Sequence, residues 1–140
     1  MPVVGRVAVF LGICVFAVSV LCGCSLVRVE EEPRTPLDYT IPDPEKLPAE
    51  IVSLMEERKD EGFQMTYQMG DELYLMKGYG RQMTGGYSIR VKEVSESSSS
   101  VFFATNLLGP KELRQGDEPS YPFVVVKIAW TEKPVTFEPA

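Results

Sequence analysis

The sequence predicts a small α+β fold, mostly β, in which one short helix precedes five to six strands of an antiparallel sheet or sandwich. Three observations support this prediction. Apolar residues recur at helical spacing between Pro48 and Gly62, and from Phe63 onward they follow the period of two that strands require. No internal repeat is present. A run of strands after a single helix is typical of a mostly antiparallel α+β domain.

The expected helix begins near Pro48 and ends before Gly62. Proline suits the first position of a helix, and glycine commonly ends one. Ile51, Leu54 and Met55 share one face because they are spaced three and four residues apart. We expect this short apolar face to pack against the core rather than against a partner.

Six segments have the residue pattern of strands. Tyr87, Ile89 and Val91 alternate with polar residues, as in a strand with one buried face. Residues 121–130 are almost continuously apolar, which predicts a central strand covered on both faces. The six expected strands are residues 63–68, 72–78, 87–94, 101–105, 121–130 and, at an edge, 134–137.

The composition excludes several kinds of chemistry. The chain has no histidine, which removes Ser-His-Asp and Cys-His nucleophile systems and His-ligated metals. A formal net charge of -6 argues against nucleic acid as a partner. Adjacent acids such as Asp71-Glu72 lack the separation of a glycosidase pair, and no calcium-loop spacing is present. We therefore expect no enzyme activity, no cofactor and no metal site.

The N-terminus carries a membrane-targeting pattern, because residues 7–27 contain no charge. One interpretation is a transmembrane anchor, which needs about 20 apolar residues. The other is a secretory signal. The tetrapeptide Leu21–Cys24 (Leu-Cys-Gly-Cys) resembles the bacterial lipobox, and it ends the apolar stretch. We therefore favour a lipoprotein signal peptide over residues 1–23, with lipid on Cys24. Both interpretations place the remaining chain outside the cytoplasm, on the cell membrane.

Residues 24–46 are expected to form the lipidated cysteine and a tether. This segment combines three consecutive glutamates with four prolines, a composition that favours an extended, solvated chain. The folded domain is then expected to span residues 47–140. Cleavage before Cys24 removes Cys14 and Cys22, so the exported domain would have neither a free thiol nor a disulfide.

Residues 78–87 are the most unusual segment, with four glycines in ten residues between two expected strands. Two interpretations are open. The segment is either a structural hairpin or bulge in which Gly85-Gly86 supplies positive φ angles, or an exposed loop that presents Arg81, Tyr87 and backbone amides to another protein. Phosphate binding is not expected, because no P-loop pattern is present.

Two motifs resemble a known family. The sequence Thr-Gly-Gly-Tyr-Ser-Ile at residues 84–89, followed by Tyr-Pro-Phe-Val-Val-Val-Lys-Ile at residues 121–128, looks like the C-terminal domain of the PrcB family over residues 72–137. That family is named for a lipoprotein subunit of a bacterial cell-surface protease complex. Met83 stands where the family usually has a proline, which would stiffen the turn.

The resemblance implies a membrane-anchored, non-catalytic protein-binding module on the extracytoplasmic face of the membrane. Its implied partner is an exported protease or another cell-envelope protein, and the module would be a subunit or accessory factor of a cell-surface protease complex. We expect the loop to supply the contacts with this partner. The expected contact residues are Arg81, Thr84, Gly85, Gly86 and Tyr87.

The alternative function is direct protease inhibition by the same loop. The loop is similar to the Asn-Pro-Thr-Thr-Gly-Tyr loop of chagasin-type cysteine-protease inhibitors, which are also small β folds. The match includes Thr84 and Tyr87. This is an analogy of loop and fold, and an activity is decided by the site itself.

Overall fold

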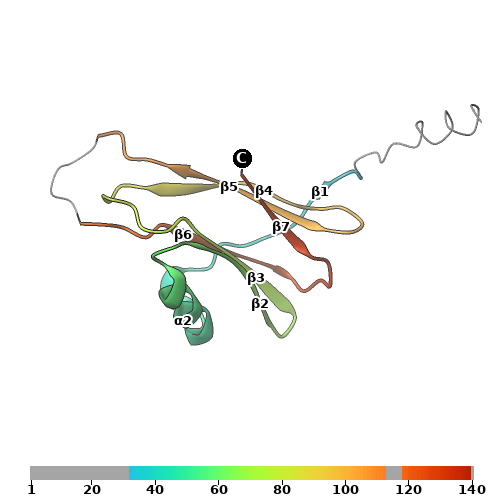
Figure 1. The fold of residues 1–140 in the computed structure, drawn as a ribbon. Coiled ribbons are helices and arrows are strands. Elements are labelled where there is room, and N and C mark those ends of the chain that lie inside the picture. Colours follow the sequence, from blue (N-terminus) through green and yellow to red (C-terminus); the bar gives the residue numbers. More distant parts are fainter. Residues whose placement is uncertain (1–31, 113–117, 140) are drawn as a thin grey trace, which may run out of the picture. The chain divides into compact units, whose positions relative to one another are not determined.

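The computed structural model describes residues 32–112 and 118–139, whose compact unit begins at Pro33. This part of the chain is mostly β, with seven strands in two sheets and one short helix before the six long strands (Figure 1). The expected fold class is therefore confirmed. The expected signal peptide and the lipid site Cys24 lie outside the described residues.

The two sheets have the strand orders β1-β4-β5-β7 and β2-β3-β6. Neighbouring strands are antiparallel except β5 and β7, which are parallel. The elements in chain order are β1 (Thr35–Pro36), a 3-10 turn η1 (Pro44–Lys46), α2 (Ala49–Arg58), β2 (Phe63–Met69), β3 (Glu72–Gly78), β4 (Ser88–Glu96), β5 (Val101–Leu108), β6 (Phe123–Ala129) and β7 (Val135–Pro139).

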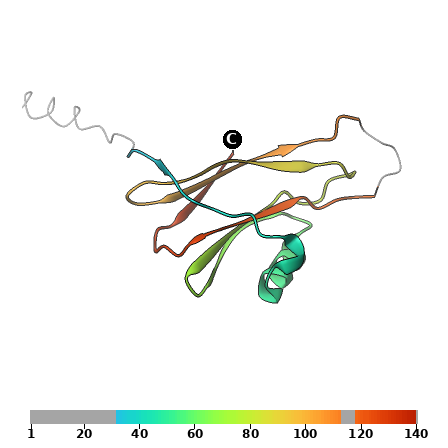
Figure 2. The same ribbon diagram turned by 180° about the vertical axis from the view of Figure 1, so that it is seen from behind.

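The main core lies between the two sheets, as Figures 1 and 2 show by the facing arrangement of β5 and β7 with β3 and β6. Phe103 of β5 packs against Phe137 of β7, with ring centroids 5.8 Å apart. The buried residues of this inter-sheet core are Leu73, Leu75, Val94, Val101, Phe103, Val124, Val126 and Ile128.

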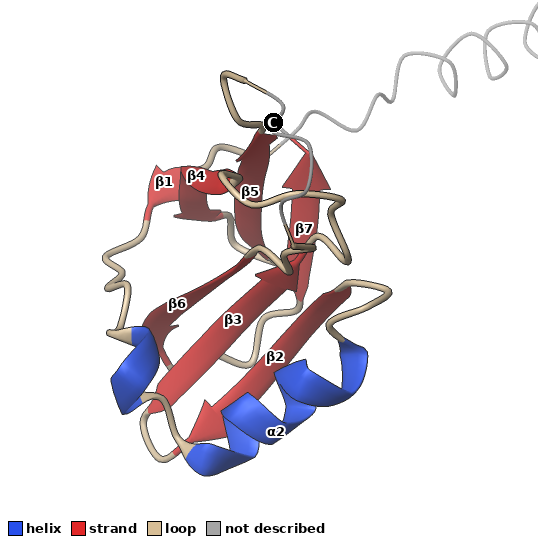
Figure 3. Cartoon of the chain, turned by 90° about the vertical axis from the view of Figure 1, so that its left-hand side faces the viewer, coloured by secondary structure: helices blue, strands red, loops and turns tan. Residues whose placement is uncertain are grey.

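Helix α2 covers the other face of the β2-β3-β6 sheet (Figure 3). The helix begins at Ala49, one residue later than expected, and Pro48 is the residue that precedes it. The predicted apolar face packs as expected at Ile51 and Met55, while Leu54 is only half-buried. The buried residues of this helix-side core are Ile51, Met55, Phe63, Tyr74, Met76 and Val125.

Residues 121–130 were expected to contain a central strand, and this expectation was wrong. The central strand of this sheet is β3, and β6 lies at its edge. Strand β6 is buried on both faces, as its apolar run indicates, because Val124 and Val126 face the inter-sheet core and Val125 faces the helix side. Within residues 32–112 and 118–139, its outer edge pairs only at the isolated bridge between Thr40 and Lys127. An apolar run therefore reports burial of both faces and does not report the position in the sheet.

Strand β4 contains a β-bulge that reverses which residues face the core. Val91 pairs with Thr105 and Glu93 with Ala104, which leaves Lys92 as an extra residue. Val91 packs on the inter-sheet core before the bulge, and Val94 is buried in it afterwards. The inserted residue shifts the alternation from odd to even positions.

The expected tether is shorter than the sequence indicated, because residues 33–46 lie against the domain. Strand β1 pairs with β4, and Leu37 N–H donates to the Val94 carbonyl. Thr40 exchanges two backbone hydrogen bonds with Lys127 of the other sheet, at 3.0 and 2.8 Å. Proline is compatible with such a short edge strand, which needs few backbone donors. The compact unit thus starts at Pro33 rather than at residue 47.

Arg34 fixes the start of this segment on the outer face of the β1-β4-β5-β7 sheet. Its guanidinium lies 3.5 Å from the ring centroid of Phe102, 3.0 Å from a carboxylate oxygen of Glu93 and 2.7 Å from one of Glu138. Hydrogen bonds from Ser95 and Arg34 hold the pKa of the Glu93 carboxyl below its usual value. The ionised carboxylate is therefore the form that the folded state favours.

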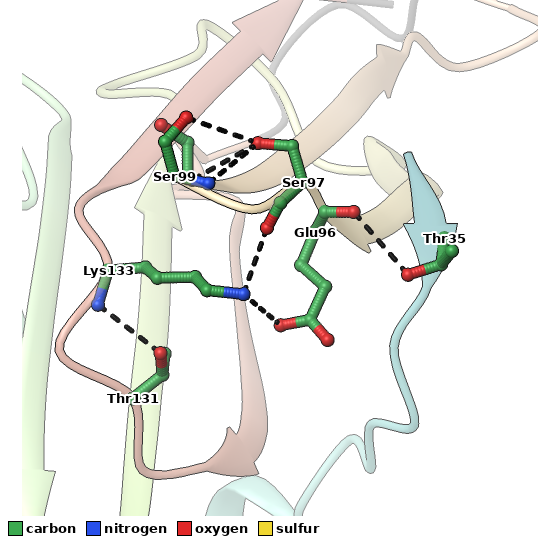
Figure 4. A network of polar contacts seen from close by, with 7 residues as sticks. Thr35, Glu96, Ser97, Ser99, Thr131 and Lys133 are labelled. Carbon is green, nitrogen blue, oxygen red and sulfur yellow. Dashed lines mark hydrogen bonds and ion pairs between the residues drawn. The ribbon is translucent and has the colours of Figure 1, made fainter. Parts of the chain in front are cut away.

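The serine-only segment between β4 and β5 closes on itself and on the β6–β7 loop (Figure 4). The Ser97 hydroxyl oxygen accepts hydrogen bonds from the backbone N–H of Ser99 and Ser100, each at 3.2 Å. Lys133 Nζ donates to the Ser97 carbonyl at 2.9 Å and to the Glu96 carboxylate at 3.1 Å. These contacts tie the turn between β4 and β5 to the loop between β6 and β7.

The Arg34 cluster predicts a pH-dependent contribution to stability. A folded pKa below the unfolded one stabilises the fold above the usual glutamate pKa of 4.5, and this contribution is lost as the pH falls through the lowered value. We expect Glu93→Gln to lower the free energy of unfolding at pH 7 by a few tenths to about 1 kcal/mol, as for exposed ion pairs. Urea unfolding from pH 7 down to pH 3 should show the two proteins converge, whereas Glu132→Gln, at an exposed position, should match the wild type throughout. A constant difference across this range would contradict the assignment.

Candidate functional site

The glycine-rich loop between β3 and β4 is held along one flank by the segment that leads into β6. Tyr79 N–H donates to the Pro122 carbonyl at 3.0 Å. Gln82 and Ser120 exchange backbone hydrogen bonds at 2.8 and 3.1 Å, and the Ser120 hydroxyl donates to the Thr84 carbonyl at 2.6 Å. The loop that opens the first motif is therefore in contact with the segment that opens the second, although about 30 residues separate the two motifs.

The start of the loop is held on a second side by the turn after helix α2. Arg81 N–H donates to the Asp60 carbonyl at 3.0 Å. Gly80 has a φ of +77°, and a Cβ atom there would lie 3.1 Å from the same carbonyl oxygen. A glycine is required where the backbone takes this left-handed conformation against a neighbouring chain.

The two glycines of the Thr-Gly-Gly-Tyr motif differ in their structural role. Gly86 has a φ of +84°, and a Cβ atom there would lie 2.9 Å from the Cβ of Pro110. Gly85 has no positive φ, and a Cβ atom there would have no heavy atom within 4 Å. The expectation that both supply positive φ is confirmed at Gly86 and wrong at Gly85.

The five predicted contact residues lie together on this loop, but the structure exposes them unequally. Arg81 and Gly86 are exposed, whereas Thr84, Gly85 and Tyr87 are half-buried. The Thr84 hydroxyl donates to the Gly85 carbonyl at 3.2 Å, so this side chain is partly used within the loop. Whether these residues contact a partner stays a prediction.

Met83 is the residue that the sequence interpretation missed. Its side chain is 79% exposed, the highest value among the exposed large apolar residues of the described chain. The sequence identified it only as the replacement for a proline. The signal that marks it is an apolar residue in the middle of a loop of mostly polar and glycine residues, because exposed methionine is common at adaptable binding surfaces.

An apolar groove adjoins the loop, between helix α2 and the start of β6. It has a volume of about 310 Å³, and it exposes 39% of Val52 and 41% of Phe123. Lys59 Nζ lies 4.9 Å from the ring centroid of Tyr121 and 3.0 Å from a Glu56 carboxylate oxygen. That carboxylate raises the pKa of Lys59, which stays charged at the rim. The groove is lined by Pro44, Leu47, Val52, Met55, Glu56, Lys59, Phe63 and Tyr121–Phe123.

The loop and groove together offer hydrogen-bonding backbone, one arginine and exposed apolar side chains. No group of three or more cysteine, aspartate or glutamate side chains in the described ranges is placed to hold a metal ion. None of the helices in those ranges is long and apolar enough to cross a bilayer. The arrangement has the chemistry of a surface for protein recognition, in which methionine, aromatic residues and arginine are enriched.

The fold and the site define a small two-sheet β domain with a clamped surface loop. Residues 73–129 match the family model described as PrcB C-terminal, and this part of the chain is a PrcB C-terminal domain. The expected resemblance is thereby confirmed over nearly the range that the motifs indicated. The match runs from β3 to the end of β6, so it includes the loop but not α2, β2 or β7. Comparisons with curated proteins and with solved structures find no match.

The different roles of the two glycines give a direct test of the loop. We expect Gly86→Ala to lower the free energy of unfolding by about 1–3 kcal/mol, because a Cβ at this φ is strained and meets Pro110. Gly85→Ala should change it by less than about 0.5 kcal/mol, because the site is open. Urea unfolding of the purified chain measures both. Equal losses in the two variants would contradict this description of the loop.

Proposed function

We propose that the protein is a membrane-anchored lipoprotein whose extracytoplasmic domain binds a protein partner without catalysis, as a subunit or accessory factor of a cell-surface protease complex. The observation that carries this proposal is the clamped loop, which exposes Met83 and is bonded through Tyr79 to Pro122 of the apolar groove. The PrcB C-terminal domain supports it, because that family is named for such a subunit.

The anchoring of the loop favours binding. Hydrogen bonds from Gln82 and Ser120 on one side and Arg81 on the other restrict the backbone before a partner arrives. A preorganised loop loses less conformational entropy on association than a free one. Met83 and Phe123 then supply apolar contact area, and Arg81 supplies a charged group for specificity.

The proposed membrane anchor rests on the lipobox at Cys24. The start of the compact unit limits how far the domain can lie from the proposed lipid. The compact unit begins at Pro33, so only residues 25–32 separate it from the proposed lipid. At roughly 3.3–3.6 Å per residue, this segment spans at most about 30 Å. A partner of this domain would therefore lie at the same membrane surface.

The anchor has its own test. We expect Cys24→Ser in the full chain to abolish incorporation of labelled fatty acid and to release the protein from the membrane fraction, because the thiol is the acylated atom. Cys22→Ser should keep both the label and the membrane association. Unchanged labelling of Cys24→Ser would refute the lipoprotein assignment.

The partner site is tested by cross-linking on whole cells, followed by purification of the full chain. We expect Met83→Asp to reduce the recovery of the cross-linked partner by at least tenfold, because a charge is placed in the centre of an apolar contact. Met69→Asp is the matched control, since this methionine is also exposed but lies at the far end of β2. Equal recovery from both variants, or no partner with the wild type, would overturn the proposal.

Direct inhibition of a protease is the second candidate, and the clamping of the loop favours it because a rigid loop resists cleavage. If the recovered partner is a protease, its rate of peptide hydrolysis in the presence of the added domain distinguishes an inhibitor from a scaffold. An inhibitor lowers the rate of peptide hydrolysis in proportion to the domain added and stays intact. A scaffold leaves the rate unchanged, and a domain that the protease degrades is not its inhibitor.

A further inference from the structure

A second cleft lies between the two sheets and is lined by residues of β2, β3, β5 and β7. Figure 3 shows β7 and β2 on the same side of the domain. It has a volume of about 360 Å³, within the range of small ligand sites. Phe103, Leu107 and Phe137 form apolar walls, and Gln64 contributes an amide from β2. It is separate from the groove beside α2, because the two share no lining residue.

Lys77 is the unusual residue of this cleft. Leu73 and Leu75 precede it on the same face of β3, and both are buried in the inter-sheet core. The ammonium group of Lys77 therefore follows these two apolar side chains on the same face of β3, at the end of the inter-sheet core. Burial lowers the pKa of Lys77, which shows that the charged form is partly desolvated.

Lys77 forms no ion pair with the residues that the structure describes. Its Nζ lies 4.8 Å from the ring centroid of Tyr79, and none of the ion pairs of the described chain includes it. The nearest acidic lining residue is Glu138, whose carboxylate binds Arg34 at 2.7 and 3.4 Å on the outer face of the sheet. A partly desolvated cation that forms no ion pair has electrostatic complementarity for an anion.

The strand edges beside the cleft indicate what carries this anion. Among the described strands, β7 and β2 are the last strands of their sheets on this side, so their outer backbone groups pair with no strand. Such edges accept an added peptide strand through main-chain hydrogen bonds. A peptide that enters here and ends in the cleft would place its terminal carboxylate near Lys77 and its last side chain against Phe137.

We propose that this cleft binds the C-terminal end of an extended peptide, with the terminal carboxylate paired to Lys77 and an apolar last side chain between the sheets. The Tyr79 hydroxyl, 2.5 Å from the Thr105 hydroxyl oxygen, fixes the ring beside the ammonium. Tyr79 is also the first residue of the clamped loop, so an occupied cleft would lie directly beside the anchored end of the partner-binding surface. This site does not depend on the function proposed for the loop.

The test titrates the purified full chain in detergent with N-acetyl-Ala-Val-Val bearing a free C-terminal carboxylate, by calorimetry and by NMR of backbone amides. We expect binding that shifts the amide signals of Lys77 and Tyr79. The same peptide with a C-terminal amide should bind at least tenfold more weakly, because a charge-assisted hydrogen bond is lost. Hexanoate, which has the carboxylate but no peptide backbone, should also bind at least tenfold more weakly.

Two variants complete the test. Lys77→Met should lose the preference for the acid over the amide while folding normally, because it replaces a partly desolvated cation with an apolar side chain of similar length. Lys92→Met removes one positive charge from an exposed position on β4 and should bind as the wild type. The proposal is overturned if the acid does not bind at millimolar concentration, if acid and amide bind equally, if hexanoate binds as tightly as the peptide, or if Lys77→Met keeps the preference.

Discussion

The burial of strand β3 on both faces is the constraint on which the rest of this domain depends. Leu73 and Leu75 face the inter-sheet core, and Tyr74 and Met76 face helix α2, so one strand joins three layers. No cysteine lies after residue 24, so apolar packing must hold these layers together without a disulfide. Each functional feature lies where this strand ends, because the glycine-rich loop leaves it after Gly78.

The end of β3 also explains why two possible sites adjoin each other. Tyr79 donates its backbone N–H to Pro122 beside the groove, while its hydroxyl pairs with Thr105 in the cleft between the sheets. The proposed partner surface and the proposed peptide cleft therefore share one anchoring residue. Lys77 lies on the same face of β3 as the core residues Leu73 and Leu75. It therefore lines the cleft at the point where the inter-sheet core ends.

Sequence patterns predicted the elements well where burial follows a simple period. The segment 72–78 is found as β3 with the same bounds, and the turn before it and the helix-side positions Ile51 and Met55 follow the expected pattern. The alternation of apolar and polar residues was misleading in β4, where a β-bulge changes which side chains face the core. The extra residue at Lys92 moves the core-facing side chains of β4 from odd to even positions, and no composition signal marks such a bulge.

The sequence by itself determined the fold class, the absence of histidine chemistry, the family of residues 73–129 and the loop in which the proposed contact residues lie. These properties follow from residue type and local spacing. Only the tertiary structure decided that residues 33–46 belong to the domain, that Gly86 but not Gly85 is constrained, and that Lys77 lines a cleft between the sheets. Each of these depends on a neighbour distant in the chain, which a local pattern does not encode.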